Sequence, residues 1–129
     1  MLGAYQSHEI DDVWYRVSPL IQRVIDKVDL VYTLDDIRDS LKGQEMQLWV
    51  EYKDTLNSIC VTRIVTNPKY KFLEIILNAG NLASVPFLEG IEIWAKSQGC
   101  KKISLIGRKG WGKVLTDYKL TQVTLEKEL

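Results

Sequence analysis

The chain has 129 residues, of which 46% are hydrophobic and 26% are charged, a composition that suits one domain with a buried core. Lysine plus arginine and aspartate plus glutamate both total 17, so the formal net charge is zero and specific nucleic-acid binding is not expected. No apolar run reaches the about 18 residues of a membrane span, and the first residues lack the basic and apolar regions of a signal peptide.

The residues that could bind a metal are few and far apart. Cys60 and Cys100 form no CxxC pair, and the one histidine, His8, lies near the start of the chain. A protein metal centre needs several ligands at close spacing, so we expect none. We expect both cysteines to be reduced, as in a cytosolic protein. Activation of a serine or cysteine nucleophile requires a histidine base, and His8 near the start of the chain is the only histidine in the sequence, so we expect no such catalytic group.

The first third of the chain is predicted to be helical. Residues 9–28 place apolar side chains at helical spacing, but Pro19 interrupts the pattern, so we expect a kink or break after Ser18. A second helix is predicted to begin at Thr33, which has capping-box spacing with Asp36, and to end at Gly43.

Three strands are predicted next. Residues 46–54 alternate and should pair with residues 58–66 through a turn at 54–57, and Asn67-Pro68 makes another turn. Residues 71–80 form the third strand, which is apolar enough in its second half to be central and covered on both faces. The residues expected on one face of the first of these strands are Leu48, Val50 and Tyr52.

The last third alternates between helix and strand. A helix is predicted from Ser84 and Pro86 to Gly99, followed by a strand over 101–107, a short helix over 109–118 and a final strand over 121–129. Strand, helix and strand in succession over 72–106 predict a right-handed crossover and a parallel strand pair. The apolar stripe of the first of these helices comprises Phe87, Leu88, Ile91, Trp94 and Ala95.

This order of elements resembles the GNAT family of N-acetyltransferases, with a weak first strand allowed near residues 3–7. The stretch "EIWAKSQGCKKISL" looks like the family's third helix and the strand after it. The whole chain is also similar to small GNAT-like proteins of tailed bacteriophages, through its "LWVEY" strand and its "LEKEL" ending. The resemblance implies one α/β domain over residues 1–129, with a mixed, mostly antiparallel sheet, a splayed parallel strand pair and flanking helices.

The same resemblance implies an acetyl-CoA site. In the family, the splayed strands bind the pantetheine arm through their backbone, and the N-terminus of the next helix binds the pyrophosphate. Here the loop falls on residues 79–84, where Ala79 replaces a usual arginine and Leu82 a usual glycine. The residues expected to contact the cofactor are Gly80, Asn81, Leu82, Ala83, Ser84 and Arg108.

The catalytic residues are also altered relative to the family. Its usual tyrosine, a general acid toward the leaving thiolate, aligns with Leu115, which has no proton to give. Tyr118 is the available replacement, on a different face of the predicted helix. Glu74 is the candidate general base, although a salt-bridged or edge-exposed carboxylate is the alternative. Glu51 is a second candidate base, but its position between Trp49 and Lys53 predicts a solvent-facing side chain.

Two functions of different class follow from the resemblance. The first is an acetyl-CoA-dependent N-acetyltransferase acting on a small amine or a protein amine. The second is a catalytically degenerate phage protein that contacts a phage or host protein, or assembles as a homo-oligomer. It would lie in the host cytoplasm or on the virion. The altered loop and the missing tyrosine favour the second function.

Overall fold

The computed structural model describes residues 2–28, 30–53, 55–80, 85–105, 118–119, 121 and 124–129. Its sheet contains the strands β1 (Leu2–Tyr5), β2 (Gln47–Lys53), β3 (Thr55–Thr66), β4 (Lys71–Gly80) and β5 (Cys100–Leu105), in that order. The helices are α1 (Ile10–Lys27), α2 (Leu34–Lys42) and α3 (Val85–Ser97), with a 3-10 turn at Ser7–Glu9 before α1. None of the described helices is long and apolar enough to span a membrane.

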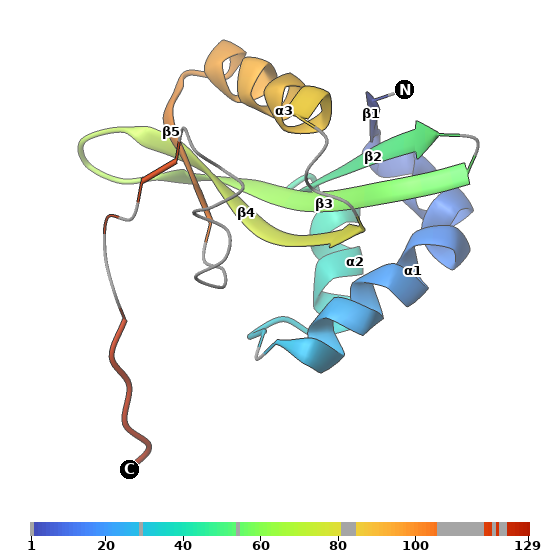
Figure 1. The fold of residues 1–129 in the computed structure, drawn as a ribbon, viewed down its shortest axis with the longest axis horizontal. Coiled ribbons are helices and arrows are strands. Elements are labelled where there is room, and N and C mark those ends of the chain that lie inside the picture. The colour runs from blue at the N-terminus through green and yellow to red at the C-terminus, as the bar shows by residue number, and fades with distance from the viewer. Residues whose placement is uncertain are drawn as a thin grey trace.

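The sheet is mixed, as predicted. β1–β2, β2–β3 and β3–β4 pair antiparallel, whereas β4 and β5 pair in parallel. Figure 1 shows α3 on one face of the sheet and α1 with α2 on the other. The predicted parallel pair and the α/β fold class are therefore confirmed.

Each face of the sheet buries its own core. Along β2, Leu48 and Val50 point toward α1 and α2, whereas Trp49 points toward α3, because side chains of a strand alternate. The first core, between the sheet and α1–α2, includes Ile10, Val17, Ile21, Ile37, Leu41, Leu48, Val50, Ile59, Val61, Leu77 and Ala79. The second core, which we term the α3 core, comprises Trp49, Cys60, Leu73, Ile75, Phe87, Leu88, Ile91 and Ala95.

A kink or break was predicted in the first helix, and the break is wrong. α1 continues without interruption from Ile10 to Lys27, with Pro19 inside it. Pro19 lies on the exposed side of the helix. There the carbonyl of Tyr15, which loses its usual donor to the proline, can bond to water instead. The buried positions Val13, Val17 and Ile21 continue in register across the proline, so packing holds the helix together.

The capping-box and alternation patterns in the sequence correctly predicted α2 and the β2–β3 hairpin, apart from the length of the hairpin turn. Thr33 caps α2, its hydroxyl accepting from the Asp36 N–H at 3.1 Å while the Asp36 carboxylate accepts from the Thr33 N–H at 2.9 Å. The hairpin forms as predicted, but β3 already begins at Thr55, which pairs with Lys53. The turn is therefore shorter than the predicted turn over 54–57.

The predicted final strand is also wrong. Residue 121 and residues 124–129 belong to no strand, and Leu125 and Leu129 are 92% and 116% exposed. Alternation alone does not create a strand when no neighbouring strand completes the hydrogen bonds. The predicted helix over 109–118 lies outside the described residues, apart from Tyr118.

Phe87→Ala should lower the free energy of unfolding by about 3–5 kcal/mol, because truncation leaves a cavity in the α3 core. Phe87 is 0% exposed, whereas Ile93 on the same helix is 71% exposed. Ile93→Ala is the matched control and should change stability by less than about 0.5 kcal/mol. Urea unfolding measures both, and equal losses would contradict the packing of α3.

Candidate functional site

The candidate site lies in the second half of β4. The described part of the parallel ladder between β4 and β5 runs from Lys71–Cys100 to Ile75–Leu105, and Leu105 is the last residue of β5 that the structure describes. β4 continues to Gly80 and remains paired with β3 on its other side. Within the described residues, Ile76–Gly80 therefore has no strand partner on its β5 side.

A β-bulge marks the same position. Ile75 pairs with Thr62 and Leu77 pairs with Val61, so Ile76 is one residue more than β3 can match. The bulge redistributes the side chains: Ile75 belongs to the α3 core, whereas Leu77 belongs to the core under α1 and α2. A bulge bends its strand and increases the local twist.

Asn78 places a buried polar group on this unpaired segment. It lies opposite Cys60 on β3, and residues directly opposite share a face, so its side chain lies on the α3 side of the sheet. Its Nδ2 is buried and has no hydrogen-bond partner. Among the described residues it is the only such side-chain atom. A buried donor without an acceptor costs stability, which makes Asn78 the group most in need of a ligand.

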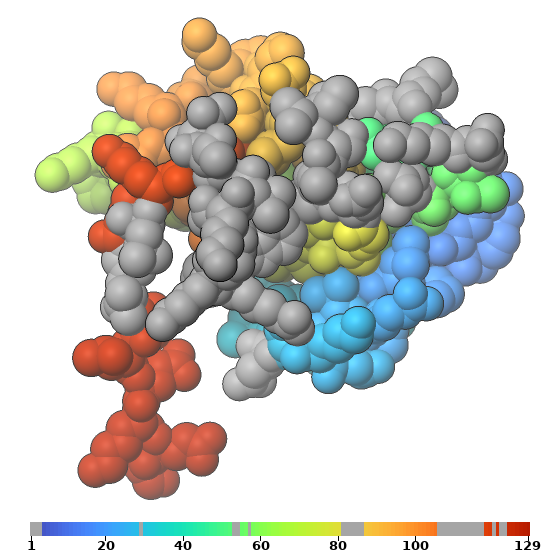
Figure 2. All heavy atoms as spheres, in the orientation of Figure 1, coloured from blue at the N-terminus to red at the C-terminus, as the bar shows by residue number. Residues whose placement is uncertain are grey.

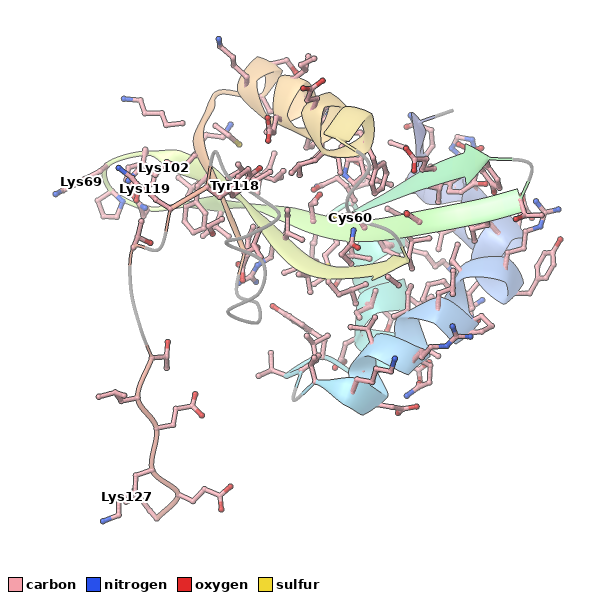
Figure 3. All side chains as sticks on the ribbon, viewed as in Figure 1. Cys60, Lys69, Lys102, Tyr118, Lys119 and Lys127 are labelled. Atoms are coloured by element: carbon pink, nitrogen blue, oxygen red, sulfur yellow. The ribbon has the colours of Figure 1, made fainter. Side chains whose placement is uncertain are left out.

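The cysteine opposite Asn78 does not supply that acceptor. Cys60 is 0% exposed, and burial raises the pKa of its thiol to about 12. The neutral thiol is a weak hydrogen-bond acceptor. Figure 3 shows Cys60 in the middle of the sheet, away from the strand ends. Both cysteines are free, and no cluster of three or more potential metal ligands occurs among the described residues.

A second polar row crosses the sheet at the end of β4. Gly80 lies opposite Ser58, and Ser58 lies opposite Glu51 on β2. Gly80 has a φ of +94°, a conformation that L side chains rarely adopt, so a glycine is required where the chain leaves the sheet. Glu51 is only 6% exposed, and the prediction of a solvent-facing side chain is wrong. Because residues two apart on a strand share a face, Glu51 lies on the same side of the sheet as Trp49, the side covered by α3.

Glu74 lies at the closed end of the site, one residue before the last described rung of the β4–β5 ladder. Its Oε2 accepts from Arg63 Nε at 3.0 Å, and the side chain is 23% exposed. The Arg63 guanidinium lies over the Tyr32 ring, 5.9 Å from its centroid, on the side of α1 and α2. The carboxylate is thus ion-paired, and its role as a base stays a prediction.

Tyr118 lies on the opposite side of the sheet from Glu74. Its hydroxyl donates to Glu92 Oε1 on α3 at 2.7 Å, and its ring packs against the α3 core. Figure 3 shows it beside β5. Its role as a general acid stays a prediction. The remaining predicted contacts, Asn81, Leu82, Ala83, Ser84 and Arg108, lie outside the described residues. α3 begins directly after that loop, at Val85.

The comparisons with known proteins give matches in structure only. The sequence matches no family model, and no curated protein matches it. Among solved structures, the chain is similar to a ribosomal-protein-alanine N-acetyltransferase from Brucella melitensis biovar Abortus, with a TM-score of 0.70 and 8% identity. That match covers 100% of this chain and 99% of the other.

Two further similar structures were solved with ligands. One is an aminoglycoside acetyltransferase from an uncultured soil metagenomic sample in complex with sisomicin, with a TM-score of 0.71, 7% identity and coverage of 100% and 95%. The other is a predicted acetyltransferase from Clostridium acetobutylicum with acetyl-CoA, with a TM-score of 0.66, 16% identity and coverage of 100% and 94%. At such identities the likeness establishes the fold, which is that of GNAT acetyltransferases.

Asn78→Leu should leave the unfolding free energy of the ligand-free protein unchanged or raise it by about 1–3 kcal/mol, because it removes a buried donor that has no acceptor. Asn67→Leu is the matched control. Its Oδ1 accepts from the N–H groups of Lys69 and Tyr70 at 2.8 and 2.9 Å, so it should lose about 1–2 kcal/mol. Urea unfolding compares them, and similar losses in both variants would show that Asn78 is satisfied.

Proposed function

We propose that the chain binds acetyl-CoA along the unpaired segment Ile76–Gly80 of β4 and transfers the acetyl group to an amine. The observation that carries the proposal is the buried donor Nδ2 of Asn78, which has no acceptor and lies in the second half of β4, where within the described residues no strand pairs on the β5 side. Extended backbone that lacks a neighbouring strand offers N–H and C=O groups to the amides of a pantetheine arm. The buried donor on Asn78 fits the same ligand, which is rich in carbonyl oxygens.

The direction of the bound cofactor follows from α3. The N-terminus of a helix offers N–H groups and a positive dipole end, and α3 begins just after β4 ends. The pyrophosphate therefore belongs near residues 81–84, whose backbone N–H groups can bind an anion despite the missing arginine and glycine. The reactive end then points back toward Ile75, where Glu74 and Arg63 lie.

Glu74 is the residue proposed to take the proton from the attacking amine. In the overall reaction a carbon–nitrogen bond forms, the thioester carbon–sulfur bond breaks, and the released thiolate takes up a proton. Arg63 holds the Glu74 carboxylate in one orientation through the 3.0 Å contact. A positioned base contributes about 10²–10⁴-fold to the rate of such a step.

A second candidate function is the non-catalytic one, in which a phage protein uses this fold to contact a protein partner in the host cytoplasm or on the virion. One specific observation favours it. Both candidate catalytic groups already have partners, Glu74 with Arg63 and Tyr118 with Glu92. The two candidates differ in whether acetyl-CoA binds and in whether product forms.

Acetyl-CoA should raise the melting temperature, since a ligand at a hundred times its Kd adds about 2.7 kcal/mol to the stability of the folded state. Leu82→Glu should abolish the shift by placing a negative charge beside the pyrophosphate, whereas Leu82→Gln, a side chain of the same length without the charge, should retain it. Differential scanning fluorimetry measures both variants. No shift of the wild type at millimolar acetyl-CoA would refute the proposed site.

Glu74→Gln should lower kcat for acetyl transfer to an amine by about 10²-fold or more, with little change in acetyl-CoA binding, if this carboxylate takes the proton. Glu89→Gln makes the same change at an exposed position on α3 and should have no effect. Release of CoA thiol, measured with a panel of primary amines, reports the rate. Acetyl-CoA binding without turnover on any amine would favour the non-catalytic candidate.

A further inference from the structure

A second pocket lies near the C-terminal end of α3, whereas the candidate acetyl-CoA site lies near its N-terminal end. The pocket has a volume of about 410 Å³, which is within the range of small-molecule sites. It is bounded by the end of β1, the start of β2, the end of α2 and the residues Trp94 and Gln98. The described C-terminal residues 124–129 stand away from the body of the molecule and take no part in it (Figure 2).

The described side chains that line this pocket are all uncharged. Trp49 and Trp94 supply indole rings, and four of the lining side chains are amides. These amides, after which we term it the glutamine pocket, belong to Gln6, Gln44, Gln47 and Gln98. Each amide offers two N–H donors and a carbonyl acceptor, whereas a charged ligand would leave its charge unpaired beside them. The glutamine pocket therefore suits an uncharged ligand that carries several hydrogen-bonding groups.

A chain of hydrogen bonds fixes the orientation of the Gln47 amide. The indole Nε1 of Trp49 donates to Thr62 Oγ1 at 3.0 Å, and that hydroxyl donates to Gln47 Oε1 at 2.9 Å. Thr62 is 0% exposed and Trp49 is 5% exposed, so these bonds are protected from water. Because its carbonyl oxygen is bound in this way, Gln47 keeps its Nε2 donors for other partners, and its side chain lines the pocket.

Gln44 reaches the pocket from an unusual backbone conformation. Its φ is +64°, and it is the only non-glycine residue of the described chain with a positive φ. Glycine is the usual residue in this conformation after a helix, yet Gly43 precedes it with an ordinary φ of −81°. Gln44 Nε2 donates to Ser7 Oγ at 3.2 Å, which leaves its carbonyl oxygen for a ligand. Strained backbone of this kind clusters at ligand sites, so it supports a binding role for Gln44.

We infer that the glutamine pocket binds an uncharged saccharide. Sugar hydroxyls donate and accept, as the glutamine amides do, so one sugar can pair with several of them. The apolar C–H face of a sugar can pack on Trp94, which is half-buried. Trp94 and Trp49 are inclined by 70° with 5.2 Å between their ring centroids, so they form no parallel slot for a flat base. The inference is independent of acetyl-CoA binding.

The pocket is tested by titrating the full chain with glucose, maltose and N-acetylglucosamine while recording two-dimensional amide NMR spectra. The side-chain amide of Gln47 and the indole N–H of Trp94 should shift and saturate, with a Kd of about 1 mM. Glucuronate adds a carboxylate to the glucose ring and should bind at least about tenfold more weakly than glucose. No saturable shift with any of the three sugars at about 50 mM would overturn the inference.

Two variants separate binding from stability. Gln44→Gly fits the left-handed conformation, so the melting temperature should stay the same or rise, whereas sugar binding should weaken by about fivefold or more. Gln47→Leu removes the oriented amide and should weaken binding to a similar degree. Gln22→Leu is its matched control, because Gln22 donates to Asp26 on α1 and does not line the pocket, and binding should be unchanged.

Undiminished sugar binding in both Gln44→Gly and Gln47→Leu would exclude the glutamine pocket as the site. Glucuronate binding as tight as that of glucose would contradict the selection for uncharged ligands that its lining implies.

Discussion

One extra residue in β4, Ile76, forms a bulge and determines on which face of the sheet the following side chains of the strand lie. With the bulge at Ile76, β4 remains paired with β3 to its end, and the described ladder with β5 covers Lys71 to Ile75. The bulge also changes the face to which the strand's apolar residues belong, from the α3 core before the bulge to the core under α1 and α2 after it. The bulge therefore sets which of the two cores each apolar residue of β4 joins.

The sequence predicted those features that depend on neighbours within the chain. The capping box of Thr33 and Asp36, the apolar stripe of α3 and the turn at Asn67 each depend on residues within one or two helical turns. The parallel pair followed from the crossover between β4 and β5, which is a rule of topology. Local signals were misleading at Pro19, where burial of the opposite side of α1 outweighed the missing hydrogen bond.

The site was less predictable because its features depend on register between distant strands. Nothing near Ile76 in the sequence indicates a bulge, since Ile75, Ile76 and Leu77 are all apolar. Without the register, Asn78 cannot be placed opposite Cys60, nor Glu51 opposite Ser58. The signal that could have directed attention to Asn78 was its occurrence, as a polar residue, in the apolar second half of β4. The final strand failed for the related reason that alternation does not show whether a neighbouring strand exists, and none pairs with the described residues 121 and 124–129.

The polar groups at the two ends of the candidate site, Asn78 and Glu74, differ in whether they have a partner within the described chain. At the open end, Asn78 holds a buried donor that costs stability in the ligand-free chain, a cost that a bound carbonyl would remove. At the closed end, Glu74 already has Arg63, so its carboxylate is stable without a ligand. A fold retained only as a scaffold gains nothing from the first arrangement, whereas the second suits either function. The described residues thus support the proposed cofactor binding more strongly than the proposed catalysis. The two can be tested separately, because one rests on Asn78 and the other on Glu74.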